Sequence, residues 1–112
     1  MDISLYQLND TTVVSISGSV DALTAQEVTS YLSSKIAGGQ HHLVLDLGQV
    51  DYMSSAGLRA ILSALKESRQ EGGDLRLAAA QPGVEKILKL SGFTNILKSF
   101  PSVDEAVQSF SQ

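Results

Sequence analysis

Residues 43–65 have the sequence LVLDLGQVDYMSSAGLRAILSAL, and this stretch decides the fold class. Leu43–Leu47 is an almost continuous apolar run, which is typical of a strand covered on both faces of a sheet. After it, apolar side chains recur at the three- and four-residue spacing of a helix that buries one face. They are Leu58, Ile61, Leu62 and Leu65. A buried strand followed by an amphipathic helix predicts an α/β domain with parallel strands.

The same alternation of strand and helix patterns extends in both directions from this stretch. Residues 3–8 and 11–17 alternate apolar with polar side chains around an Asn9–Asp10 turn, which predicts a β-hairpin. Two capping boxes, Thr24–Glu27 and Ser102–Glu105, predict helix starts, because the hydroxyl can accept a hydrogen bond from the amide three residues later. The remaining elements are expected within residues 75–80, 82–92 and 93–100. The predicted order is ββαβαβαβα, with a mixed, mostly parallel sheet of about five strands and about four helices.

Length and composition exclude several classes of protein. With 112 residues, of which 43% are apolar, the chain is expected to form one domain over residues 1–112. It contains no cysteine, which excludes disulfides, zinc thiolates and a catalytic cysteine. No apolar run approaches the ~18 residues of a membrane span, and Met1–Ser4 does not have the pattern of a signal peptide. The expected location is therefore the cytoplasm.

Charge is distributed unevenly along the chain. The net charge is −4; residues 1–55 contain six acidic residues and one basic residue, whereas residues 56–112 contain six acidic and seven basic residues. This balance, with no Trp and only three Tyr and three Phe, argues against a binder of nucleic acid or of anionic membranes. The acidic first half instead favours a basic or nucleotide-handling protein partner.

The loop that enters the helix at Leu58 carries adjacent hydroxyl groups on Ser54 and Ser55. These hydroxyls can cap the free amides of the first helical turn. The same position suits a phosphate, which the helix dipole stabilises by ~0.3–1 kcal/mol. Gly57 removes a side chain where another backbone, or a phosphate donor, could approach closely. An ordinary N-cap followed by a packing glycine explains the same residues, so the local chemistry leaves both interpretations open.

No catalytic or metal-binding group is expected. His41 and His42 are adjacent on a predicted strand, so their side chains point to opposite faces and do not converge on one metal ion. They also enter the strand at the end opposite Ser55, about five residues of ~3.3 Å away. A Ser–His–Asp triad with Asp46 therefore lacks its base, and the Gly-x-Ser-x-Gly pattern is absent because Met53 lies two residues before Ser55. We predict no enzymatic activity, no metal and no cofactor.

The segment Val50–Arg59, VDYMSSAGLR, resembles the signature of the STAS domain, and more narrowly that of bacterial anti-sigma factor antagonists. In that family a strand ending in Asp-Leu, here Asp46–Leu47, leads to the pattern Asp-Ser-(Ser/Thr/Ala)-Gly-Leu at a helix start. A second family pattern, Gly-x-apolar-Asp after the second strand, is matched by Gly18–Asp21. The element order also matches over about residues 3–110. The resemblance therefore implies a single STAS domain.

The resemblance also implies a binding function that phosphorylation regulates. Family members are phosphorylated on the serine that follows the acid of the motif, which is Ser55 here. The kinase is an anti-sigma factor of the GHKL type that uses ATP, and a PP2C-type phosphatase removes the phosphate. The unphosphorylated antagonist binds this serine kinase and releases its client, whereas the phosphorylated antagonist does not bind.

The resemblance implies partner-binding residues around this serine. Asp21 matches a family acid that contributes to the kinase contact, and Asp46 is expected to end the strand beneath the loop and to order it. The complete implied set is Asp21, Asp46, Met53, Ser54, Ser55, Gly57 and Leu58. Leu23, Tyr52 and Met53 are expected either to be exposed apolar anchors for a partner or to form the lid of the core. The sequence leaves both alternatives open.

One position departs from the family pattern. The residue before the acceptor is usually Asp, and here it is Ser54, which removes a strong cap for the helix amides and a charge that would face the kinase. Ser54 is therefore the second choice as phosphoacceptor, after Ser55. The alternative function is a STAS-type adaptor subunit of a lipid or anion transport assembly, without a phosphorylation cycle.

Overall fold

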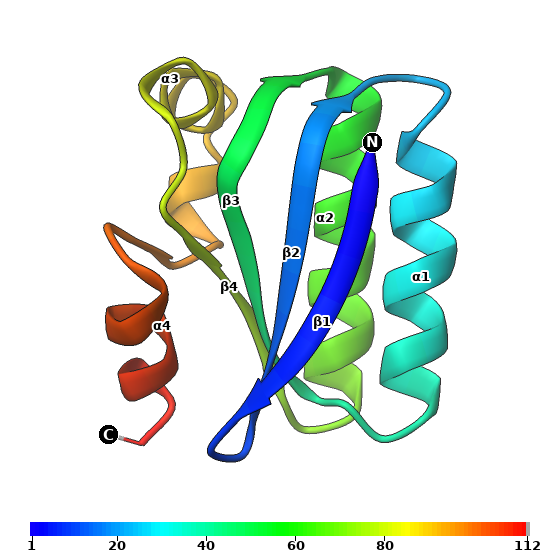
Figure 1. Cartoon of the computed structure of the whole chain (residues 1–112), viewed down its shortest axis with the longest axis vertical. Coiled ribbons are helices and arrows are strands. Elements are labelled where there is room, and N and C mark those ends of the chain that lie inside the picture. The colour runs from blue at the N-terminus through cyan, green and yellow to red at the C-terminus, as the bar shows by residue number, and fades with distance from the viewer. Residues whose placement is uncertain (112) are drawn as a thin grey trace.

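Five strands form one sheet in the order β1-β2-β3-β4-β5 (Figure 1). The computed structural model describes residues 1–111. β1 (Asp2–Leu8) runs antiparallel to β2 (Thr11–Val20). The remaining neighbours are parallel, namely β3 (His42–Met53), β4 (Asp74–Ala78) and β5 (Ser99–Phe100). The predicted hairpin and the predicted mixed, mostly parallel sheet are both confirmed.

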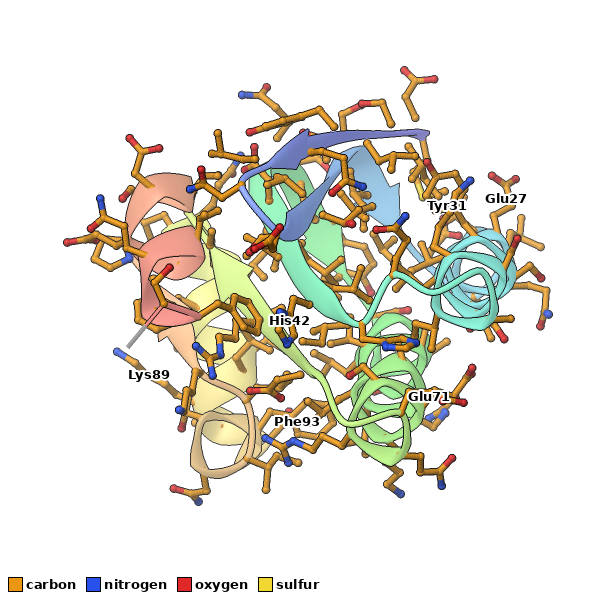
Figure 2. The ribbon with its side chains drawn as sticks, turned by 90° about the horizontal axis from the view of Figure 1, so that it is seen from below. Glu27, Tyr31, His42, Glu71, Lys89 and Phe93 are labelled. Atoms are coloured by element: carbon orange, nitrogen blue, oxygen red, sulfur yellow. The ribbon has the colours of Figure 1, made fainter. Side chains whose placement is uncertain are left out.

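Helices cover both faces of this sheet. They are α1 (Ala25–Ala37), α2 (Ser55–Gln70), α3 (Pro82–Leu90) and α4 (Val103–Ser109), with a short 3-10 turn η1 at Phe93–Asn95. α1 and α2 lie side by side on one face, and α4 lies on the other face (Figures 1 and 2). Within residues 1–111, no helix combines the length and the apolar character that crossing a bilayer requires. The predicted order ββαβαβαβα is confirmed.

The core has a large layer and a small layer, separated by the sheet. Leu43, Leu45 and Leu47 belong to the large layer, which also contains the buried side chains of α1 and α2. Val44 points the other way and packs with Val107 and other buried residues beneath α4. Alternate residues of one strand therefore serve the two layers, as expected for a strand that is covered on both faces.

β3 is longer than the sequence predicts. The apolar run ends at Leu47, but the strand continues to Met53, because Gly18–Val20 of β2 pair in parallel with Val50–Met53. The register shifts twice along this ladder, as it does at β-bulges, which bend a strand without ending it. The prediction that Asp46 ends the strand is therefore wrong. Residues 46–53 lie within the sheet, and the loop before α2 is much shorter than expected.

Candidate functional site

Ser54 begins α2 and anchors it to the neighbouring strand. Its backbone is extended (φ −87°, ψ 172°), and its Oγ accepts a hydrogen bond from the amide of Gly57 at 3.2 Å. Its own amide donates to the carbonyl of Val20 at 2.8 Å. The predicted serine cap is confirmed. No acidic side chain lies in the first turn of α2, so a hydroxyl performs the capping that a carboxylate often performs.

Ser55 is the first residue of α2 and is exposed, whereas Ser54 is half-buried. The two adjacent hydroxyls therefore have different surroundings: the Ser54 hydroxyl is engaged with the helix, and the Ser55 side chain faces solvent. Arg59 is also exposed and lies four residues further on, which places it on the same side of α2 as Ser55. This end of α2 thus presents an exposed hydroxyl beside the positive end of the helix dipole.

Gly57 is required by close packing against β2. A β-carbon at this position would lie 2.8 Å from Cγ1 of Val20 and 3.2 Å from its carbonyl oxygen, and 3.0 Å from Cγ of Met53. These distances are shorter than ordinary van der Waals contact. The backbone that approaches Gly57 is therefore that of β2. Gly57 is buried, so its role here is to let α2 begin directly over the end of β2.

The apolar residues near the site divide into buried and exposed members. Met53 and Leu58 are only 2% and 5% exposed and belong to the core. The expectation that they contact a partner directly is corrected, because their side chains support the surface from below. Leu23 and Tyr52, in contrast, are 86% and 52% exposed. The sequence left open whether these residues are exposed anchors or part of the core. Met53 is part of the core, whereas Leu23 and Tyr52 are available at the surface.

Asp21 organises the turn that leads into α1. Its Oδ1 accepts hydrogen bonds from the amides of Leu23 and Thr24, each at 3.0 Å, and from the Thr24 hydroxyl at 3.1 Å. These bonds hold the pKa of Asp21 below its usual range, the Thr24 amide having the largest effect. The carboxylate is thus stabilised in its charged form.

The capping box predicted at Thr24 does not form. The Thr24 hydroxyl accepts from the amide of Asp21 at 2.9 Å, and its single hydrogen is shared between the carbonyl of Ser19 at 2.9 Å and Oδ1 of Asp21. It makes no side-chain cap bond to α1. The hydroxyl is therefore used to close the preceding turn, and the Asp21 carboxylate binds the amides of Leu23 and Thr24, which lie just before α1.

The structure adds one polar pair that the sequence analysis missed. Ser19 donates its hydroxyl to Oδ1 of Asp51 at 3.0 Å, across the upper ends of β2 and β3. The pair was missed because residues 50–53 were assigned to a loop. Asp51 is exposed and precedes Tyr52, so the end of the sheet where α1 and α2 begin is both acidic and partly apolar.

Asp46 lies apart from this surface. It pairs with Ser15 in the sheet, whereas Met53 pairs with Val20. Five residues of β2 separate the two positions, which is roughly 16 Å at ~3.3 Å per residue. Asp46 accepts a hydrogen bond from the amide of Gly48 at 3.0 Å and so orders the bulged part of β3. The structure brings Asp21, Ser54, Ser55 and Gly57 together and leaves Asp46 outside the group.

The two histidines lie at the opposite end of β3, as predicted. The His42 ring stacks on that of Phe110 with their centroids 4.8 Å apart, and Figure 2 shows it beneath the sheet near α4. Within residues 1–111, no group of three His, Asp or Glu side chains is arranged to hold a metal ion.

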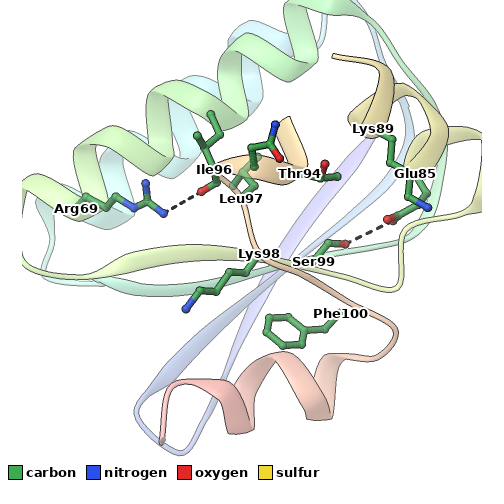
Figure 3. A pocket seen from close by; sticks show the side chains of 10 residues that line it. Arg69, Glu85, Lys89, Thr94, Ile96, Leu97, Lys98, Ser99 and Phe100 are labelled. Carbon is green, nitrogen blue, oxygen red and sulfur yellow. Dashed lines mark hydrogen bonds between the residues drawn. The ribbon is translucent and has the colours of Figure 1, made fainter. Parts of the chain in front are cut away.

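A cavity of about 520 Å³ lies between α2, α3 and β5. Figure 3 shows that its cationic side chains do not converge. Arg69 is occupied by Asp74 and by the carbonyl of Ile96, at 3.0 and 2.9 Å, and Lys98 points away from Ile96. The cavity therefore does not form an anion site, and the start of α2 remains the candidate site.

These features, a β-hairpin followed by alternating helices and parallel strands with a serine cap over the second strand, define an STAS-type domain. The family model for the STAS domain matches residues 2–106, and the chain belongs to this family. It is 32% identical over 110 residues to BtrV of Bordetella bronchiseptica, a protein assigned as an anti-sigma factor antagonist, with 98% of this chain and 95% of that protein covered.

Solved structures share the fold at lower sequence identity. A Thermotoga maritima protein described as an anti-sigma factor antagonist superposes with a TM-score of 0.93 at 20% identity, covering 98% of this chain and 95% of that one. The anti-sigma factor antagonist SpoIIAA in its unphosphorylated form superposes with a TM-score of 0.84 at 19% identity, covering 98% and 96%. Its phosphorylated form from Bacillus has also been solved, with a TM-score of 0.74 and 19% identity.

Proposed function

We propose that this protein is an anti-sigma factor antagonist whose binding is switched off by phosphorylation of Ser55. In this proposal the unphosphorylated chain binds an anti-sigma factor of the GHKL serine kinase type and releases the client of that kinase. The kinase transfers a phosphate from ATP to Ser55, and a PP2C-type phosphatase removes it. The chain itself acts as substrate and binding partner, and it catalyses no step.

The observation that carries this proposal is the difference between the two adjacent serines. Ser54 is half-buried and its Oγ is engaged with the amide of Gly57, whereas Ser55 is exposed at the first position of α2. A kinase can reach the Ser55 hydroxyl without opening the helix. The names of the relatives and the existence of SpoIIAA in both phosphorylation states support a phosphorylation cycle for this chain as well.

The proposed switch is an electrostatic change at a fixed surface. A phosphate on Ser55 adds a charge of about −1.5 to −2 and three acceptor oxygens. The helix dipole tolerates that charge, so the domain keeps its fold. A partner surface fitted to a neutral hydroxyl would have to desolvate the phosphate without a counter-charge, which costs several kcal/mol. Each ~1.4 kcal/mol lowers the affinity tenfold, so this cost is sufficient to release the partner.

The partner surface that we propose lies at the end of the sheet where α1 and α2 begin. Leu23 and Tyr52 provide exposed apolar area, and Asp21 and Asp51 provide negative charge. Such a combination fits a partner with an apolar pocket whose basic side chains face Asp21 and Asp51, whereas the part of the pocket that meets Ser55 carries no positive charge. A phosphate on Ser55 would increase the negative charge beside these carboxylates.

The proposal is tested by incubating the protein with ATP and a candidate GHKL-type kinase encoded nearby, followed by mass spectrometry of the peptide that contains both serines. We expect one phosphate on Ser55, its loss in Ser55→Ala, and its retention in Ser54→Ala. Binding of the kinase is expected for the unmodified chain and to fall at least tenfold for the phosphorylated chain.

Two outcomes would overturn parts of this proposal. Phosphate on Ser54 in the wild-type chain would move the acceptor by one residue and preserve the switch. No phosphate on either serine with any nearby kinase would favour the alternative function, an adaptor of a lipid or anion transport assembly. The structural similarity to a sulfate transporter family protein of Wolinella succinogenes, at a TM-score of 0.79 and 18% identity, concerns the fold alone.

A further inference from the structure

β1 is an edge strand without the usual protection against pairing. Its seven residues, DISLYQL, contain one charged residue and no Pro, Gly or Lys, and they pair with β2 in unbroken register. Natural sheets usually shorten, charge, bulge or cover such an edge. The opposite edge follows that rule, because β5 has only two residues. The long uncharged row of β1 is therefore available to a further strand.

The turn geometry identifies which backbone groups of β1 are free. Leu8 pairs with Thr11 across the two-residue turn Asn9–Asp10. The pair that flanks such a turn exchanges hydrogen bonds, and hydrogen-bonded pairs alternate with non-bonded pairs along an antiparallel ladder. The amides and carbonyls of Ile3, Leu5 and Gln7 therefore point away from β2. These three residues form a row that is symmetric about Leu5.

We propose that the chain forms a symmetric dimer in which β1 pairs antiparallel with β1 of a second copy. Leu5 lies opposite Leu5 of the second copy, and Ile3 lies opposite Gln7. Each of these pairs exchanges two hydrogen bonds, and the two sheets become one continuous sheet. Asp2 faces Leu8, so no like charges lie opposite each other in this register.

Helix α1 gives a second, independent reason to choose a copy of this chain as the occupant. β1 and α1 run in the same direction at the same margin of the molecule (Figure 1). Leu5 is the central residue of β1, and Tyr31 is the central residue of α1. A two-fold axis through Leu5 therefore places the two α1 helices antiparallel, with their Tyr31 residues at the same level.

The charges of α1 are complementary under this symmetry. Glu27 lies four residues before Tyr31, and Lys35 lies four residues after it, with its Nζ 5.1 Å from the centroid of the Tyr31 ring. Figure 2 shows Glu27 and Tyr31 on the side of α1 that faces the β1 margin. In antiparallel helices, Glu27 of each copy faces Lys35 of the other. The strand register and the charge pattern therefore select the same symmetric partner.

A cysteine-scanning experiment tests the register directly, because the chain has no native cysteine. Hydrogen-bonded antiparallel pairs have Cα atoms ~5.5 Å apart, which is within the range that a disulfide spans. Leu5→Cys is therefore expected to form an intermolecular disulfide under mild oxidation. Gln7→Cys is the matched control, because its symmetry mate lies four residues away along the second strand.

The different exposure of Leu5 and Gln7 distinguishes disulfides formed within the proposed dimer from disulfides formed by random collision. Gln7 is exposed, whereas Leu5 is half-buried, so collisional oxidation would cross-link Gln7→Cys faster. Cross-linking of Leu5→Cys alone is the expected result. Equal or faster cross-linking of Gln7→Cys would overturn the proposed register.

A charge exchange tests the helix contact without altering the strand. Sedimentation of the wild-type chain over micromolar to millimolar concentrations is expected to show a monomer–dimer equilibrium. Glu27→Lys is expected to weaken dimerisation ~10-fold, because two exposed ion pairs become repulsive. Adding Lys35→Glu to this variant is expected to restore dimerisation. Glu71→Lys, at the end of α2 and away from β1 in Figure 2, is the matched control and should leave it unchanged.

A third comparison tests the backbone contact. Gln7→Pro removes an outward-pointing amide without removing a core side chain, and edge strands accept proline at such positions. It is expected to abolish the dimer, whereas Gln7→Ala, which loses the same side chain, retains it. A wild-type chain that stays monomeric at millimolar concentration would overturn the proposal. This dimer does not depend on the proposed function, since phosphorylation of Ser55 is measured separately.

Discussion

The starts of α1 and α2 lie at the same end of the sheet and are joined through Val20, yet they are completed in opposite ways. At α1, the carboxylate of Asp21 accepts hydrogen bonds from two backbone amides and from the Thr24 hydroxyl. At α2, the Ser54 hydroxyl accepts one amide, and the next residue, Ser55, is exposed. The start of α1 therefore already carries a negative charge. The first turn of α2 carries none, so a negative charge added there would be stabilised by the helix dipole.

This difference is what the proposed switch needs in order to act without moving the backbone. The α1 start is fixed by interactions within the chain, so it provides a constant acidic surface. The α2 start is fixed by Gly57 packing and by the Ser54–Val20 bond, neither of which involves the Ser55 hydroxyl. The proposed modification therefore acts on a group whose chemistry is separate from the bonds that hold the helix in place.

The largest effect on stability is expected from Gly57→Ala, which would push the start of α2 away from the end of β2. Gly57→Ala places a methyl group 2.8 Å from Cγ1 of Val20, so α2 must shift from the end of β2. Overpacking of this kind costs ~1–3 kcal/mol, which urea denaturation would measure as a lower free energy of unfolding.

Gly83→Ala is the matched control for this change. Gly83 also lies in the first turn of a helix, but a β-carbon there would meet nothing within 4 Å. Alanine at this position is expected to be neutral or to stabilise by up to ~1 kcal/mol. Equal effects of the two substitutions would show that the contact with Val20 is not what requires glycine at position 57.

The next effect is expected from removing the charge of the α1 start. Asp21→Ala removes the acceptor of two amides and should lower the Tm by several degrees, whereas Asp21→Asn should retain part of the effect because its side-chain oxygen still accepts. Asp51→Ala is the control, since Asp51 receives one side-chain bond from Ser19. An Asp21→Ala variant as stable as Asp51→Ala would contradict the role of Asp21 in holding the turn before α1.

The pH dependence of this contribution has a definite sign. Hydrogen bonds, first that of the Thr24 amide, lower the pKa of Asp21 in the folded chain. The folded state therefore binds this proton less readily than the unfolded state, and the stabilisation is present above about pH 4. It is lost as the pH falls through the native pKa. The stability difference between wild type and Asp21→Asn should shrink in acid, as thermal unfolding between pH 7 and pH 2 would measure.

These same two helix starts show what the sequence alone could and could not predict. The Ser54 cap and the need for Gly57 follow from local chemistry, and both are present in the structure. The Thr24 capping box was equally clear as a pattern and is wrong, because the Thr24 hydroxyl is engaged with the Asp21 amide and the Ser19 carbonyl of the preceding turn. A local pattern does not reveal that the preceding turn already uses the hydroxyl.

The extension of β3 was missed for a related reason. Gly48 and Gln49 interrupt the apolar run, and the strand continues past them only because β2 offers pairing partners as far as Val20. That pairing joins residues about 33 positions apart and contains register shifts, which no local window contains. The exposed Ser19–Asp51 pair and the buried position of Met53 both follow from it.

A smaller effect is expected at the Ser54 cap. Ser54→Ala removes the acceptor for the Gly57 amide and should cost ~1 kcal/mol, whereas Ser54→Asp should retain the cap and add a favourable charge. Ser102→Ala is the matched control, because Ser102 caps α4 through an amide at the same distance of 3.2 Å. Comparable losses in the two alanine variants, measured by urea denaturation, would assign Ser54 an ordinary capping role and leave the regulatory role to Ser55.

The smallest effect on stability is expected at Ser55, and it is the most informative. Ser55→Asp adds a negative charge to the uncharged first turn of α2 and should stabilise the fold by ~0.3–1 kcal/mol at low salt, with the gain reduced at high salt. Ala22→Asp is the matched control at the α1 start, where Asp21 already occupies the amides and repels a second carboxylate, so the gain there should be smaller.

Backbone amide spectra of Ser55→Asp complete this comparison. If charge alone is the signal, the shifts are confined to the first turns of α2 and to the adjoining end of β2, because the Ser54–Val20 bond and the Gly57 contact persist. Shifts spread through the sheet, or a net loss of stability, would mean that the helix start rearranges when it is charged. The proposed switch would then have to include a conformational change at the start of α2.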